Sequence, residues 1–179
     1  MTNTITTTER DDILELLHHH RGLFRFTVQG LSDEVARTTP TVSELSLAGL
    51  IKHVTAVERN WADFVVNGPA EQTFSDWENI DWSNPPAAVV EWQNGFRMLE
   101  GETLAGLLEA YDAAAAATDE LVRTVDLDTR HPLPEAPWTE PGATWSARRA
   151  LVHIALETAQ HAGHADIIRE TIDGQKSMG

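Results

Sequence analysis

The chain has 179 residues, a length typical of one domain that can bury a substantial core. Its formal net charge of −15 disfavours binding to nucleic acids and to anionic membranes. The chain contains no cysteine, which excludes disulfides, thiolate metal ligands and cysteine nucleophiles. No apolar run approaches the ~18–20 residues of a membrane span, and the N-terminus lacks the features of a signal peptide. We therefore expect a soluble cytoplasmic protein.

Two long stretches in the first half carry apolar residues three and four positions apart, the spacing of amphipathic α-helices. The first helix is predicted from about Glu9 to Gln29, with Thr8 as N-cap and Asp11 completing a capping box. The second begins after the N-cap Ser46 and ends at Gly68, followed by proline. A short helical turn is expected between them.

Two further long helices are predicted at 103–125 and 146–172, the last closed by Gly174. The connections at 69–102 and 126–144 look irregular, although a short helix could follow the two prolines after Asn84. No strand-like alternation is evident. The chain is predicted to be all-α: a single four-helix bundle over residues 1–179, with 1–7 disordered.

The connection at 69–102 is long enough to cross the length of the bundle, because a helix of ~22 residues spans only ~33 Å. The second and third long helices are therefore predicted to run parallel.

Five charged or ionisable side chains could gather at one site. His53 lies among the apolar positions of the second long helix, where a lone histidine is more often a hydrogen-bonded core residue. On the last helix, His161 points inward and Glu157 flanks it one turn away, with His164 and His153 further round. An inward carboxylate and imidazole are costly to bury, and a divalent cation held with His53 would use both. The alternative is a hydrogen-bonded Glu–His pair.

The remaining histidines are interpreted as non-functional. His18, His19 and His20 occupy consecutive helical positions about 100° apart, so they cannot share one face or bind one metal. His131 lies beside Pro132 in a predicted loop and is expected to face solvent.

Two segments, SLAGLIKHVTAVERNW (46–61) and ETAQHAGHADIIRETIDG (157–174), resemble signature segments of the DinB/YfiT-like superfamily of metal-binding four-helix bundles. The likeness covers nearly the whole chain and points to an actinobacterial-type branch of unassigned function. This branch is related to the N-terminal domain of mycothiol-dependent maleylpyruvate isomerases and to mycothiol S-transferases. The resemblance implies that His53, Glu157 and His161 are the metal ligands.

Many members of the superfamily have histidine where this chain has Glu157. The isomerases resemble this chain in having glutamate there, with zinc bound, which favours Zn²⁺ over Ni²⁺; a 2-His-1-carboxylate set also suits non-heme Fe²⁺. His164 stands where many relatives have glutamine and is expected to support a ligand or line the pocket. The 179 residues do not include the extra C-terminal domain of those isomerases, so we do not expect their particular substrate.

The resemblance implies a zinc-dependent enzyme that uses a low-molecular-weight thiol, such as mycothiol or bacillithiol, in S-transfer to an electrophilic substrate or in isomerisation. Zinc in an open site lowers the pKa of bound water or thiol, and without cysteine the thiol must arrive as a cosubstrate. The alternatives are a metal-dependent hydrolase that activates water and a metal-binding stress-response protein without turnover. We also expect a homodimer.

Five tryptophans lie in or beside the two long connections and are interpreted as anchors that hold these loops on the bundle; alternatively, some cover the metal pocket. They are Trp77, Trp82, Trp92, Trp138 and Trp145.

Overall fold

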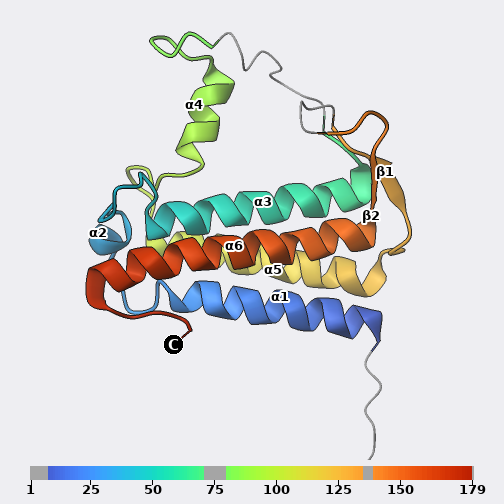
Figure 1. Ribbon diagram of the computed structural model, residues 1–179, viewed down its shortest axis with the longest axis horizontal. Coiled ribbons are helices and arrows are strands. Elements are labelled where there is room, and N and C mark those ends of the chain that lie inside the picture. Colours follow the sequence, from blue (N-terminus) through green and yellow to red (C-terminus); the bar gives the residue numbers. More distant parts are fainter. Residues whose placement is uncertain (1–7, 71–79, 135–138, 179) are drawn as a thin grey trace, which may run out of the picture.

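The computed structural model describes residues 8–70, 80–134 and 139–178, and its four long helices form a bundle (Figure 1). The segment 1–7, for which the sequence predicts disorder, lies outside these ranges. Within the described part, no helix is long and apolar enough to cross a membrane. The long helices are α1 (Glu9–Phe26), α3 (Leu47–Asn67), α5 (Leu104–Thr124) and α6 (Ala147–Asp173). The short elements are α2 (Asp33–Ala36), α4 (Ala87–Asn94), β1 (Arg130–Pro132) and β2 (Thr144–Ser146).

The predicted helix starts are confirmed. Thr8, Ser46, Thr103 and Ser146 each accept a hydrogen bond from the backbone N–H three residues further on, which satisfies a donor that the first turn leaves unpaired. The first helix ends three residues earlier than predicted. Its chain tightens after Phe26 into turns whose hydrogen bonds span three residues, such as Val28 N–H to the Arg25 carbonyl.

Ion pairs and hydrogen bonds at the helix ends fix the directions of the helices. Arg148, at the start of α6, pairs with Glu9 at the start of α1, so these helices run parallel. Arg10, in the same first turn of α1, donates to the Val125 carbonyl just after α5, at 2.8 Å, so α1 and α5 are antiparallel. The connection that contains α4 returns the chain to the end of the bundle at which α3 begins, and α5 begins there too. This confirms that α3 and α5 run parallel.

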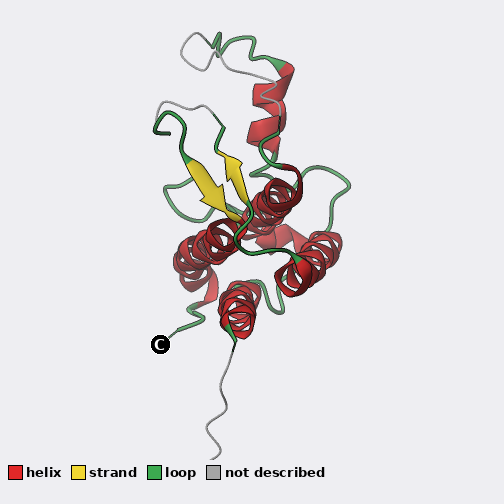
Figure 2. Cartoon of the chain, turned by 90° about the vertical axis from the view of Figure 1, so that its right-hand side faces the viewer, coloured by secondary structure: helices red, strands yellow, loops and turns green. Residues whose placement is uncertain are grey.

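Seen end-on, the four long helices surround one core (Figure 2). Around the bundle α1 packs on α6, α6 on α3 and α3 on α5. The helix α6 therefore lies between α1 and α3. Its two lines of contact, called seams below, join it to helices that are far from it in the sequence.

The two short strands are a feature that the sequence did not predict. β1 and β2 pair antiparallel, with His131 opposite Trp145, and three residues are too few for an alternating pattern to show. The expectation that His131 faces solvent is wrong. Its ring packs on Phe64 with centroids 5.6 Å apart and its Nε2 is buried, because the hairpin lies against the end of α3.

A polar layer divides the buried core into two apolar clusters. On α1, Arg21 lies between Leu17 of one cluster and Phe24 of the other, and it forms an ion pair with the fully buried Glu58 of α3. Arg21 also donates to Asp119 of α5 at 2.7 Å. The guanidinium thus ties three helices together in the centre of the bundle.

Candidate metal centre

The seam between α3 and α6 brings together the three residues that the sequence predicts as ligands. The rings of His53 on α3 and His161 on α6 meet edge to face, with centroids 4.8 Å apart. One turn earlier on α6, Glu157 directs Oε2 toward His161, 3.8 Å from its Nε2. Two imidazoles and a carboxylate from different helices are therefore direct neighbours.

Burial keeps both imidazoles neutral. It lowers the pKa of His53 to about 4, and the nearby His161 adds to this effect. Burial also lowers the pKa of His161, with His164 acting in the same direction and Glu157 opposing it. A neutral imidazole offers a lone pair, so the donor set suits zinc or non-heme iron.

The side chains are close without being gathered around one point. In the part of the chain that the structure describes, no three histidine, aspartate or glutamate side chains converge closely enough, as they stand, to hold an ion. The residue types, their protonation and their position fit a divalent cation. The assignment of His53, Glu157 and His161 as ligands stays a prediction.

Glu157 has a second neighbour that the sequence placed nearby but gave no role. His153 lies one turn before Glu157 on α6, and its Nε2 is 3.2 Å from Oε1 of Glu157. The carboxylate therefore lies between two histidines, with one oxygen toward each. Only 26% of its side chain is exposed.

His164 stands beside His161, as the sequence led us to expect. Their Nδ1 atoms are 3.4 Å apart, and the ring centroids are 5.3 Å apart. This contact suits a residue that supports His161, and that role stays a prediction.

The segment after α4 covers His53 with an aromatic ring that sequence reasoning missed. Phe96 stacks on the His53 imidazole, with centroids 4.1 Å apart and planes 20° apart. Trp92 of α4 meets the edge of Phe96 and is 54% exposed. Nothing in the local pattern marks Phe96, because its position depends on how the connection folds back over α3.

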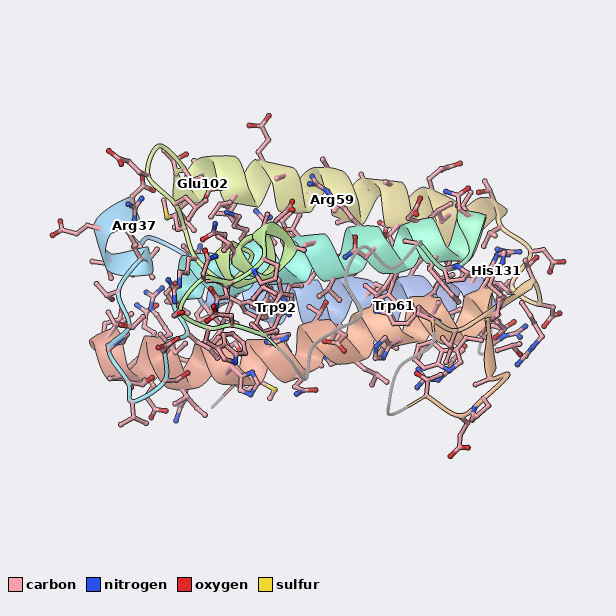
Figure 3. All side chains as sticks on the ribbon, turned by 90° about the horizontal axis from the view of Figure 1, so that it is seen from above. Arg37, Arg59, Trp61, Trp92, Glu102 and His131 are labelled. Atoms are coloured by element: carbon pink, nitrogen blue, oxygen red, sulfur yellow. The ribbon has the colours of Figure 1, made fainter. Side chains whose placement is uncertain are left out.

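At the other end of the seam, Trp145 of β2 stacks on Trp61 of α3, with centroids 4.9 Å apart. Figure 3 shows Trp61 and Trp92 over the α3/α6 side of the bundle, with Trp61 nearer His131. The interpretation of the tryptophans as anchors is confirmed for Trp145. It is wrong for Trp82, which is 63% exposed because the turn before α4 projects from the bundle. Trp77 and Trp138 lie outside the described residues.

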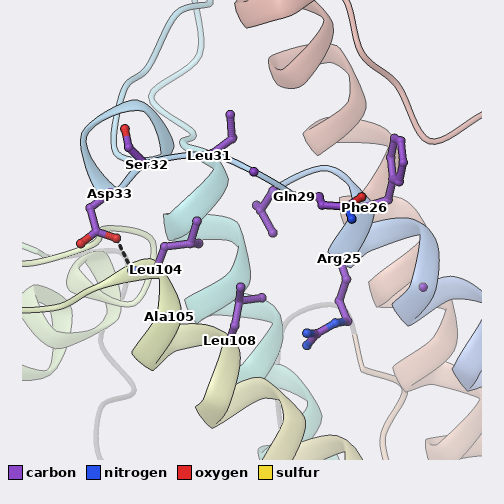
Figure 4. A pocket seen from close by; sticks show the side chains of 12 residues that line it. Arg25, Phe26, Gln29, Leu31, Ser32, Asp33, Leu104, Ala105 and Leu108 are labelled. Carbon is purple, nitrogen blue, oxygen red and sulfur yellow. Dashed lines mark hydrogen bonds between the residues drawn. The ribbon is translucent and has the colours of Figure 1, made fainter.

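A cavity of about 660 Å³ lies elsewhere, between the end of α1 and the start of α5 (Figure 4). Its charged lining groups already have partners. Arg25 pairs with Asp112, and Asp33 accepts a hydrogen bond from the Leu104 N–H at 2.8 Å. This cavity offers no cluster of candidate ligands, so the α3/α6 seam remains the candidate site.

Comparison with known proteins identifies the family of this chain and supports its fold. The sequence profile of the mycothiol S-transferase family matches residues 12–174. A crystal structure of a conserved protein from Enterococcus faecalis is similar in fold, with a TM-score of 0.64 and 17% identity; the alignment covers 95% of this chain and 100% of that one. No curated protein gives a significant match. The chain belongs to the mycothiol S-transferase family of DinB-like helical bundles.

Proposed function

We propose that the protein is a metal-dependent transferase that joins a low-molecular-weight thiol of the mycothiol type to an electrophilic substrate. In this proposal His53, Glu157 and His161 hold a divalent cation, with zinc as the first candidate. The observation that carries it is the contact between the imidazoles of His53 on α3 and His161 on α6, beside the Glu157 carboxylate. Family membership supplies the class of cosubstrate.

The chemistry follows from what the chain has and what it lacks. The chain has no cysteine, so the sulfur nucleophile comes from the cosubstrate. A divalent cation bound by these residues would lower the pKa of the thiol and provide a thiolate at neutral pH. His53 and His161 keep their lone pairs available because burial disfavours their protonation.

The surrounding aromatic side chains shape the site. Phe96 shields one face of the His53 ring from water. The exposed Trp92 beside it offers an apolar surface for the organic part of the electrophile. In the transfer, the thiol sulfur bonds to the electrophilic carbon, the leaving group departs with the electrons of its bond, and the thiol proton passes to solvent. Cytoplasmic location and homodimer formation stay predictions from the sequence.

The test is metal content and thiol-dependent turnover of the purified protein. We expect about one divalent ion per chain and conjugation of mycothiol to a fluorogenic alkyl halide. His161→Ala should lose most of the metal and the activity, since it removes a ligand without touching the two apolar clusters. The control is His19→Ala, which removes an exposed histidine on α1.

Other outcomes would reject the proposal in favour of a named alternative. Bound metal with hydrolysis but no thiol transfer would indicate a hydrolase. Bound metal without any turnover would indicate a metal-binding protein, and near-stoichiometric metal in His161→Ala would overturn the site itself.

A further inference from the structure

The ring of His153 is held in a fixed orientation at the side of the candidate centre. It meets Trp61 at 4.9 Å and Trp145 at 5.0 Å between centroids, edge to face in both contacts. The two indoles stack on each other, and the Arg149 guanidinium lies over the Trp145 ring at 4.3 Å. Residues from α3, β2 and α6 together therefore limit how the imidazole can rotate.

This orientation directs the His153 ring to the carboxylate of Glu157. Nε2 of His153 is 3.2 Å from Oε1, within reach of a hydrogen bond in which the ring N–H donates. The other carboxylate oxygen, Oε2, is the one that faces His161. A carboxylate ligand needs one oxygen for the ion, so a donor on the other oxygen can fix its direction.

We propose that His153 is a positioning residue, whose Nε2–H holds Oε1 of Glu157 so that Oε2 is presented to the metal centre. This inference rests on the proposed function, because it takes Glu157 as a ligand. It explains why α6 places a histidine on each side of Glu157: His161 lies toward the ion, and His153 orients the carboxylate between them.

Helix geometry argues against His153 as a ligand of the same ion. His153 and His161 are eight residues apart on α6, which is about 12 Å along the axis at 1.5 Å per residue. Two histidine nitrogens on one zinc ion lie within about 4 Å of each other, since each Zn–N bond is about 2 Å. His53 contacts His161 directly, whereas Trp61 and Trp145 hold His153 on the side of Glu157 that faces away from His161.

The experiment compares three substitutions at His153 that differ in whether they keep an N–H donor. His153→Gln keeps an N–H donor, whereas His153→Met removes it; His153→Phe also removes it but keeps an aromatic ring against Trp61 and Trp145. Zn²⁺ and Co²⁺ dissociation constants are measured by chelator competition on the folded full-length protein. The absorption spectrum of bound Co²⁺ reports the ligand geometry. His19→Met serves as the surface control.

We expect His153→Met and His153→Phe to bind about 10–100-fold more weakly than wild type, with an altered Co²⁺ spectrum, the usual cost of losing such a partner. His153→Gln should recover most of the affinity. If one donorless variant does not fold, the other still gives the comparison with His153→Gln.

Three results would overturn the inference. Wild-type affinity in His153→Met or His153→Phe would show that the donor does not matter. Equal loss in all three variants, as complete as in His161→Ala, would make His153 a ligand. Absence of metal binding by the wild type would reject the proposed function, and the inference with it, before any variant is compared.

Discussion

Gly49 and Phe96 approach so closely that a Cβ added to the glycine would lie 2.0 Å from the Phe96 carbonyl oxygen. This close crossing lets the chain that follows α4 pass over the first turn of α3. The crossing also places the Phe96 ring flat on His53, four residues further along the helix. The absence of a side chain at Gly49 therefore allows Phe96 to cover His53 at the candidate centre.

Gly49→Ala should destabilise the protein. In a helix, alanine is favoured over glycine by about 0.5–1 kcal/mol. Here the added methyl meets backbone atoms, which cannot turn aside, and we expect a net loss of about 1–3 kcal/mol. Gly163→Ala is the matched control, because nothing lies within 4 Å of its Cβ position, and it should stabilise by about 0.5–1 kcal/mol. Urea titrations measure the free energy of unfolding of both variants. If Gly49→Ala is more stable than wild type, the Phe96 backbone does not lie this close to Gly49.

The buried pair of Arg21 and Glu58 should respond unequally to removal of its two partners. In the described part of the chain, Glu58 pairs with one cation, Arg21. Arg21 has two anionic partners, Glu58 and Asp119. Arg21→Met therefore leaves a buried carboxylate without a partner and should cost about 3–5 kcal/mol. Glu58→Gln should cost less, because Asp119 still compensates the guanidinium.

The double variant Arg21→Met/Glu58→Met separates the ion pair from the packing. With neither charge left in the layer, it should be more stable than Arg21→Met alone. Free energies of unfolding from urea titrations give this comparison. If the cost of the double variant equals the sum of the costs of Arg21→Met and of Glu58→Met made singly, the pair is not coupled.

Asp119 should make the protein sensitive to acid. Burial acts against ionisation, but hydrogen bonds from Arg21 and His18 outweigh it and lower the pKa of Asp119 below its ordinary 3.8. The unfolded chain then binds the proton more readily, so this contribution to stability is complete above about pH 3.8 and is lost as the pH falls through the lower folded-state value. Asp119→Asn should be less stable at neutral pH and should lose less additional stability in acid.

The measurement is the free energy of unfolding of wild type and Asp119→Asn at a series of pH values. Parallel curves for the two proteins below about pH 4 would show that Asp119 does not contribute this dependence.

In the proposed site, Glu157 is the ligand that sets the charge of the loaded centre. With one carboxylate, a site loaded with a divalent cation carries roughly +1, and a histidine in its place leaves roughly +2. Glu157→His should therefore retain metal but shift the pH optimum of thiol-dependent activity downward, because the bound thiol becomes more acidic. Glu157→Ala should lose much of its metal affinity.

Metal content and pH–rate profiles of wild type and both Glu157 variants decide between these outcomes. If Glu157→Ala binds zinc as tightly as wild type, Glu157 is not a ligand, and His164, beside His161, becomes the candidate third donor.

The sequence by itself determined the four long helices and their inward faces. Helix starts such as Ser46 and Ser146 could be predicted because a cap and its hydrogen-bonded partner are three residues apart. The inward positions of His53 and His161 follow from helical periodicity in the same way. The parallel course of α3 and α5 was also predictable, since only a connection of that length can return along the bundle.

The tertiary structure decided which inward residues meet. Periodicity shows the face that a residue occupies but not the residue opposite to it, which depends on how two helices are aligned along their seam. Three contacts join segments that are far apart in the chain: His53 with His161, Phe96 with His53, and His131 with Phe64. The contact of His153 with Glu157 is local, but its fixed orientation comes from Trp61 and Trp145 on other elements. Packing between elements, rather than hydrogen bonding within one helix, set these positions.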